Sequence, residues 1–269
     1  MSDGAGGYAQ VNGLNMYYEI HGSGDPLVLL HGALSATETS FGALLPELAK
    51  NRKVIAVEQQ GHGRTADIDR PLTVPQMADD TAALLAHLGI ERADLVAYSM
   101  GSAVALQLAL RRPDLVRKLV LLSVSFDAAG LHPGVLAGID MMTPDALTGS
   151  PFEEEYRRLA PNPADWPTLI AKTQDLDRNL ADLDLAPEVV ASIQAPTLVV
   201  IGDSDIIRPE HAVQMFRLLG GGVIGDIAGL PDSQLAILPG TTHMTIVSRA
   251  DLLLAMIPPF LDAPMPKTD

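Results

Sequence analysis

Ser99 has the surroundings best suited to covalent chemistry in this chain. It is the third residue of Ala-Tyr-Ser-Met-Gly, residues 97–101, where an apolar strand-like run meets an Ala-rich helix-like run. A chain that passes so abruptly from strand to helix must bend sharply at Ser99, which favours small residues such as Ala97 and Gly101 on either side. The bend lifts the hydroxyl to a helix N-terminus, whose partial positive charge favours a developing anion. The pattern therefore predicts a nucleophilic serine.

His243 is the favoured base for this serine. A serine hydroxyl needs an adjacent group that takes its proton, and His243 lies in a loop directly after the last expected strand, residues 234–238. Loops at the carboxyl ends of parallel strands converge on one edge of a sheet, where Ser99 is also expected. The remaining six histidines are interpreted as structural or surface side chains: His21, His31, His62, His87, His132 and His211.

Asp203 and Asp205 are the two candidates for the carboxylate that orients the histidine. Both follow an expected strand at 197–202. Asp203 adjoins the strand and is suited to capping the turn, whereas Asp205 lies far enough into the loop to turn back toward a histidine. We favour Asp205, because a carboxylate held against the imidazole fixes its tautomer. The chain order is then serine, acid, histidine.

Two backbone N–H groups are expected to hold the anion that forms when the serine attacks. One is the N–H of Met100, directly after the nucleophile. The other is the N–H of Ala33, in the loop that follows an expected strand at 26–31. The glycine before Ala33 lets that backbone approach a ligand closely, as an oxyanion hole requires.

The elements that position these residues alternate between apolar strands and helices, which is typical of a mostly parallel sheet covered on both faces. Strands are expected at 15–20, 26–31, 53–58, 94–99, 116–123, 197–202 and 234–238, and helices at about 41–50, 74–88, 100–111, 209–219 and 249–257. Thr73 and Gln76 form a capping box for the second helix. Pro258 and Pro259 are expected to end the last helix.

The segment from 126 to 192 breaks this alternation and predicts a helical cap inserted into a core domain formed by 1–125 and 193–269. It is rich in Pro, Met and acidic residues, and it is too long for an ordinary connection. Its apolar side chains either pack the cap on the core or line an apolar substrate pocket. The expected pocket residues are Leu131, Met141, Met142 and Trp166 of the segment, with Leu34 and Tyr98 of the core.

The amino-acid composition limits the classes of molecule that this chain is expected to bind and the chemistry that it is expected to perform. The formal net charge of −15 argues against nucleic acids and anionic membranes, which attract clustered Lys and Arg. The absence of cysteine excludes disulfides and thiol catalysis. No metal or other cofactor is expected, because the Asp203-x-Asp205 pair lacks the further ligands of a calcium loop.

Residues 1–10 lack the features of a signal peptide and no apolar run could span a membrane, so a cytoplasmic protein is expected. The oligomeric state is left open.

Five stretches together resemble the α/β-hydrolase superfamily. They are His31-Gly32, Gly61–Thr65, Ala97–Gly101, Gly202–Asp205 with Pro209, and Gly240–His243, and the resemblance extends from about Val11 to Leu261. The chain is similar to the serine esterase, haloperoxidase-like and C–C hydrolase group. The resemblance implies an eight-stranded, mostly parallel sheet flanked by helices, with a helical cap insertion. It also supports Asp205, since the acid of this superfamily usually stands three residues after the glycine that ends its strand.

Two departures from the superfamily bear on the chemistry. Glu58 stands where many relatives have an aspartate in a structural loop, which leaves the site unaffected. The nucleophile is Ser99 where haloalkane dehalogenases and epoxide hydrolases of similar fold use aspartate, so those two chemistries are disfavoured.

These observations predict hydrolysis of a small or medium apolar carboxylic ester through an acyl-enzyme, without a cofactor. The nearest alternative is lactone hydrolysis, C–C bond hydrolysis or cofactor-free perhydrolysis by the same three residues. An alternative of another class is a ligand-sensing receptor that retains the hydrolase fold.

Overall fold

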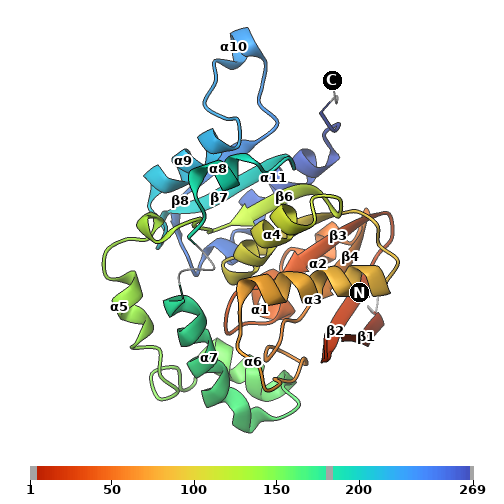
Figure 1. Ribbon diagram of the computed structural model, residues 1–269, viewed down its shortest axis with the longest axis vertical. Helices are drawn as coiled ribbons and strands as arrows, with labels where there is room; N and C mark the ends of the chain where they lie inside the picture. Colours follow the sequence, from red (N-terminus) through yellow and green to blue (C-terminus); the bar gives the residue numbers. More distant parts are fainter. Residues whose placement is uncertain (1–4, 180–183, 267–269) are drawn as a thin grey trace.

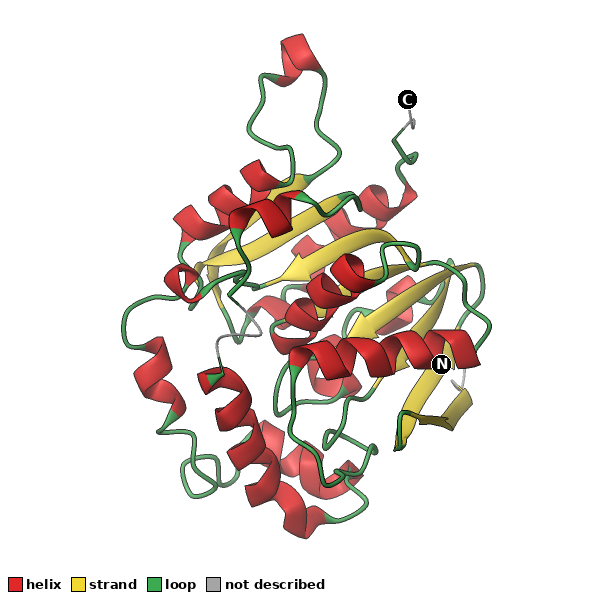
Figure 2. Ribbon diagram, in the orientation of Figure 1, coloured by secondary structure: helices red, strands yellow, loops and turns green. Residues whose placement is uncertain are grey.

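The computed structural model describes residues 5–179 and 184–266, which form an eight-stranded sheet with helices on both faces (Figures 1 and 2). The strand order is β1-β2-β4-β3-β5-β6-β7-β8. β1 and β2 are antiparallel to their neighbours, and every other pairing is parallel. The strands are β1 Ala5–Val11, β2 Leu14–His21, β3 Asp25–Leu30, β4 Arg52–Val57, β5 Ala93–Tyr98, β6 Val116–Leu122, β7 Thr197–Ser204 and β8 Gln234–Thr242. The expected mostly parallel sheet is confirmed.

Side chains of each central strand point alternately to the two faces of the sheet, as the pleat requires. In β3, Val28 and Leu30 join the hydrophobic cluster under helices α3 (Val74–His87), α4 (Met100–Arg111) and α9 (Pro209–Leu218). Leu27 and Leu29 join the cluster under α1 (Thr37–Phe41), α2 (Leu45–Leu48) and α11 (Ala250–Asp262). The sheet is thus buried on both faces, and the carboxyl ends of its parallel strands are fixed at one edge.

The described residues between β6 and β7 form helices and loops, without a further strand. The helices are η1 Ala128–Gly130, α5 Val135–Ile139, α6 Pro151–Leu159, η2 Pro163–Asp165, α7 Trp166–Arg178 and α8 Pro187–Ala191. Figure 1 shows α5, α6 and α7 gathered together, away from the sheet, at the bottom of the view. The side chain of Gln174 on α7 donates hydrogen bonds to the carbonyls of Ile139 and Met142, which ties α7 to the chain around α5.

Two helix predictions were wrong in their extent. The helix expected at 41–50 is two short helices, α1 and α2, because Pro46 has no N–H to donate and is accommodated in the first turn of α2. α11 continues through Pro258 and Pro259 to Asp262. Its last turn buries Phe260 in the core, and the ammonium of Lys118 donates to the Phe260 carbonyl at 2.8 Å. Burial and this end cap compensate for the missing N–H groups.

The N-terminal strand β1 was missed by the sequence analysis. It pairs with β2 through the turn Asn12-Gly13, and both turn residues have positive φ angles, 48° and 82°. Asn-Gly between two strand-forming runs is a strong signal for a two-residue hairpin. A further α-helix, α10 (Gly225–Ala228), lies between α9 and β8 and was not predicted. No helix in the described part of the chain is long and apolar enough to cross a membrane.

Candidate active site

Ser99 sits on a strained bend between β5 and α4. Its φ and ψ angles are 51° and −118°, a conformation that L-residues rarely adopt. Hydrogen bonds hold the bend: Ser99 N–H donates to the Leu122 carbonyl at 2.9 Å, and the Ser99 carbonyl accepts from Ser102 N–H at 2.8 Å. Gly101 is required for a reason that the sequence did not reveal. A Cβ there would lie 2.1 Å from the Leu30 carbonyl oxygen, so the end of β3, rather than the bend itself, leaves no space.

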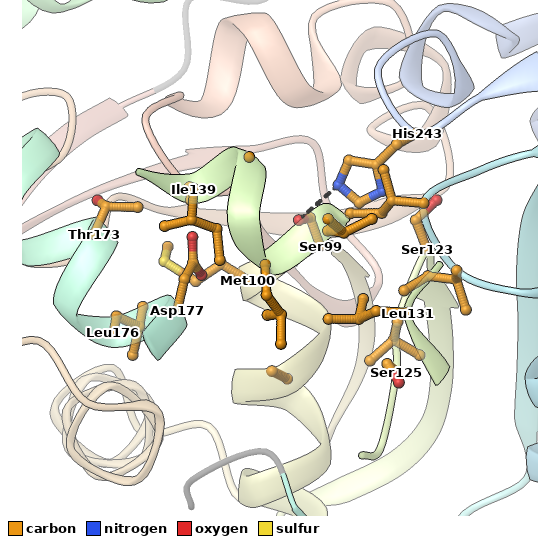
Figure 3. Close-up of a pocket in the computed structure, with 18 of the residues that line it drawn as sticks. Ser99, Met100, Ser123, Ser125, Leu131, Ile139, Thr173, Leu176, Asp177 and His243 are labelled. Atoms are coloured by element: carbon orange, nitrogen blue, oxygen red, sulfur yellow. Dashed lines mark hydrogen bonds between the residues drawn. The ribbon is translucent and has the colours of Figure 1, made fainter. Parts of the chain in front are cut away.

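The structure brings Ser99, His243 and Asp205 together from the ends of three strands. His243 follows β8 directly, and its Nε2 lies 3.0 Å from Ser99 Oγ, the contact dashed in Figure 3. Its other ring nitrogen, Nδ1, lies 2.9 Å from Asp205 Oδ1. A neutral imidazole that donates from Nδ1 to a carboxylate has Nε2 free to accept the proton of a hydroxyl. The three side chains therefore form one continuous hydrogen-bonded series.

Asp205 is held as a carboxylate by several donors. Besides His243, its oxygens accept from Ile207 N–H at 3.2 Å, from Gly202 N–H at 3.3 Å and from the hydroxyl of Ser123. Burial alone would raise the pKa of Asp205, but the hydrogen bonds from His243, Ser123 and Ile207 outweigh it and hold the pKa below its ordinary value. Ser123, at the end of β6, was missed because a serine after a strand carries no distinctive signal.

Asp203 has a separate structural task. Its carboxylate accepts the N–H of Gly240 at 2.9 Å and the N–H of Thr241 at 3.2 Å. These two hydrogen bonds hold the pKa of Asp203 below its ordinary value. Asp203 thus fixes β8 just before His243, and Asp205 is the aspartate that contacts the imidazole.

The loop after β3 brings Ala33 to the same place. Ala33, Ser99 and Met100 line one cavity. A Cβ at Gly32 would lie 2.7 Å from the Tyr98 ring, so glycine lets this loop come close to the serine bend. His31 anchors the loop: its Nδ1 donates to the Gly32 carbonyl at 2.8 Å, and its Nε2 accepts from Gln59 N–H at 3.0 Å. Burial lowers the pKa of His31 to about 4, which keeps it neutral.

Comparison with known proteins decides the family. The family model described as "alpha/beta hydrolase fold" matches residues 25–166. The chain belongs to the alpha/beta hydrolase fold family.

The relatives and the solved structure that resemble this chain carry names that indicate different reactions. The chain is 36% identical to a pyrrolizixenacetamide deacetylase of Xenorhabdus hominickii, across 93% of this chain and 98% of that protein. It is 38% identical to a 2-hydroxymuconate semialdehyde hydrolase of Pseudomonas sp. strain CF600, across 51% of this chain and 47% of that protein. The meta-cleavage product hydrolase of Pseudomonas fluorescens IP01 has the same fold, with a TM-score of 0.78 at 18% identity over 95% of this chain and 97% of that one.

This alpha/beta hydrolase has a cavity of about 360 Å³ beside Ser99 and His243, a size typical of small-molecule sites. Most of its walls are apolar, and the polar side chains Thr173 and Asp177 of α7 also line it. Four of the expected pocket residues lie in these walls: Leu34, Tyr98, Leu131 and Met142. Among the described residues, no group of three or more His, Cys, Asp or Glu side chains could hold a metal ion.

Met141 and Trp166 do not line this cavity, which corrects the sequence analysis. Met141 is 75% exposed, because adjacent residues point in different directions and its neighbour Met142 takes the inward position. Trp166 is 2% exposed and packs against Tyr156, with ring centroids 5.2 Å apart. It stabilises the packing of α6 on α7 instead of contacting a ligand.

Proposed function

We propose that this protein is a serine hydrolase that cleaves a small or medium carboxylic ester through an acyl-enzyme. The observation that carries the proposal is the continuous series from Ser99 through His243 to Asp205, with contacts of 3.0 and 2.9 Å. Such a series supplies a nucleophile, a base and an orienting acid at one point. It opens into a cavity whose volume of about 360 Å³ and apolar walls suit an apolar acyl or alcohol group.

In the proposed reaction, Ser99 Oγ attacks the ester carbonyl and its proton passes to His243 Nε2. Asp205 stabilises the resulting imidazolium through the Nδ1 hydrogen bond. The N–H groups of Ala33 and Met100 hold the oxyanion, and each such donor contributes about 3 kcal/mol of transition-state stabilisation. His243 then protonates the leaving alcohol. A water molecule, deprotonated by His243, hydrolyses the acyl-enzyme.

The helical segment 126–192 acts in this proposal as a cap over the site. Leu131, Ile139 and Leu176 come from this segment and line the cavity together with Ser99. Walls of this kind exclude bulk water and strengthen the electrostatic interactions within the site.

Amide deacylation is a second candidate, favoured by the relative that is named a deacetylase and matches nearly the whole chain. The same residues serve it, since His243 can protonate a departing nitrogen as well as an oxygen. Lactone and C–C bond hydrolysis are also compatible with the site, since a structural neighbour is named an enol-lactonase and a relative is named a 2-hydroxymuconate semialdehyde hydrolase.

A substrate panel tests the proposal. We would measure kcat/KM for 4-nitrophenyl butanoate, an acetanilide, a γ-lactone and a vinylogous diketone, with the wild type, Ser99→Ala and Ser125→Ala. Ser125 is a matched control, because this serine lines the same cavity but its hydroxyl contacts the Asp127 carbonyl and His211 instead of His243. Ester cleavage should fall by about 10⁴-fold or more in Ser99→Ala and by less than about tenfold in Ser125→Ala. Retention of a tenth of the activity in Ser99→Ala, or tight binding of these compounds without turnover by the wild type, would contradict the assignment.

A further inference from the structure

Two polar side chains of α7 line the largely apolar cavity without an evident partner. Thr173 and Asp177 stand four residues apart, on one face of the helix. Thr173 is 1% exposed, and its hydroxyl has no hydrogen-bond partner in the described structure. Within residues 5–179 and 184–266, Asp177 makes no hydrogen bond or ion pair, and His243 is the one titratable side chain that acts on it electrostatically. In Figure 3 the two α7 residues lie across the cavity from Ser99 and His243.

A carboxyl group in this position is unfavourable for the protein alone. Asp177 is half-buried, and burial raises its pKa to about 6, against the opposing effect of His243. It also stands in the last turn of α7, whose partial negative charge disfavours a carboxylate. Asp175 of the same turn shows the ordinary arrangement, because its exposed carboxylate pairs with Arg178 at 3.2 Å. No described Lys or Arg pairs with Asp177 in this way, so a bound molecule is the natural source of a cation.

The charged residues that line the cavity indicate which chemical group the bound molecule would carry. The described lining residues include Asp127 and Asp177 but no Lys or Arg. A carboxylate or phosphate on the ligand would be repelled, and a neutral hydroxyl would leave the charge of Asp177 uncompensated. A protonated amine supplies both a positive charge and N–H donors. The hydroxyl of Thr173, one helical turn away, can accept a second N–H or reorient toward the carboxylate.

We propose that Asp177 and Thr173 form a subsite that binds a protonated amino group of the substrate, at the end of the cavity opposite Ser99. The proposal rests on the hydrolase function above and narrows its substrates to esters or amides that carry a basic amine. It separates this protein from a hydrolase whose substrate is wholly apolar or anionic.

Matched ester pairs test the subsite at about pH 7.5, where both the amine and Asp177 are mainly charged. One pair is 2-(dimethylamino)ethyl butanoate and 3-methylbutyl butanoate, which differ only by N–H⁺ in place of C–H in the alcohol. The other is methyl 4-(dimethylamino)butanoate and methyl 5-methylhexanoate, which differ in the same way in the acyl chain. The wild type should favour the amine in at least one pair by about tenfold or more in kcat/KM.

Asp177→Asn should reduce that preference to about twofold or less. The control Asp175→Asn removes an equal charge from the exposed side of the same turn and should keep the wild-type preference. Because no described residue pairs with the Asp177 carboxyl, Asp177→Asn should also unfold at the same temperature as the wild type or higher, so a folding defect would not mimic the effect.

If the wild type hydrolyses the neutral ester as fast as the charged ester in both pairs, the proposed subsite is refuted and the proposed hydrolase function still stands. The same conclusion follows if the Asp177→Asn variant retains the preference. If none of the four esters is cleaved, calorimetric titration of Ser99→Ala with the same esters decides the question. Tighter binding of an amine than of its neutral partner, lost in a Ser99→Ala/Asp177→Asn variant, supports the subsite, whereas equal binding refutes it.

Discussion

Replacing Asp205 with asparagine probes the proposed proton transfer most closely, because every donor around this side chain is defined. Oδ1 accepts from His243 Nδ1 at 2.9 Å and from Ile207 N–H at 3.2 Å. Oδ2 accepts from the Ser123 hydroxyl and from Gly202 N–H at 3.3 Å. An amide offers one oxygen and one NH₂ group, so in either orientation its NH₂ faces one of the two backbone N–H groups.

The two orientations of the asparagine amide are expected to lower kcat by similar factors, for different reasons. If the NH₂ takes the place of Oδ1, His243 must accept at Nδ1 and carry its proton on Nε2, where it cannot take the proton of Ser99. The equivalent change in a serine protease costs about 10⁴ in kcat. If the NH₂ takes the place of Oδ2, the tautomer survives but the imidazolium loses its counter-charge. Two charges about 4 Å apart at an effective dielectric constant of about 20 interact by about 4 kcal/mol, which corresponds to about 10³ in rate.

We therefore expect kcat for ester hydrolysis to fall by about 10³ to 10⁴ in Asp205→Asn. Steady-state kinetics with 4-nitrophenyl butanoate measures the loss, and thermal unfolding verifies that the variant is folded. Asp203→Asn is the matched control, because among the described residues this neighbouring carboxylate accepts hydrogen bonds from Gly240, Thr241 and Ser204 and has no hydrogen bond or ion pair with His243. It should cost less than about tenfold. A folded Asp205→Asn variant with more than a tenth of the wild-type kcat, or a larger loss in Asp203→Asn, would refute the reasoning.

Three further changes have defined outcomes. Ser123→Ala removes a donor to the Asp205 carboxylate, worth about 1.5–3 kcal/mol, so kcat/KM should fall by about 10- to 150-fold; an unchanged value contradicts the role of Ser123. Gly101→Ala places a Cβ 2.1 Å from a backbone oxygen and should cost more than about 4 kcal/mol in unfolding free energy, whereas Gly138→Ala meets nothing within 4 Å and should be neutral or stabilising. Burial raises the pKa of Glu58 from 4.5 to about 7, so its contribution to stability is present below pH 4.5 and is lost as the pH rises through about 7. We would measure the unfolding free energy of the wild type and Glu58→Gln with denaturant at about pH 5 and pH 8. Between these pH values, the stability of Glu58→Gln relative to the wild type should rise by up to about 3 kcal/mol, and the same difference at both would contradict this.

Much of the fold was predictable because its signals are local. The strands β3 through β8 lie within four residues of their expected bounds. For the central strands the reason is that a strand buried on both faces needs a continuous apolar run. The bend at Ser99 and the loop position of His243 likewise follow from short motifs. The missed hairpin of β1 had a local signal too, in Asn12-Gly13, whose positive φ angles the structure displays.

What the sequence concealed depends on contacts between distant segments. The extension of α11 past two prolines depends on Lys118, which is 142 residues away from its acceptor Phe260. The choice of Met142 over Met141 depends on how the chain after α5 is rotated against the cavity. Asp177 was missed for the same reason, because a single acidic residue on an amphipathic helix is usually solvated and only packing shows that it lines a cavity.

The central claim is that Ser99, His243 and Asp205 act as one nucleophilic unit, and covalent labelling tests it most directly. The protein would be treated with a fluorophosphonate. Mass spectrometry of the intact protein would give the number of adducts, and mass spectrometry after proteolytic digestion would identify the labelled peptide. The account predicts one adduct per chain, on the peptide that contains Ser99, absent in Ser99→Ala and formed at least about 100-fold more slowly in His243→Ala. An adduct on another residue, or labelling of the His243→Ala variant at the wild-type rate, would contradict it.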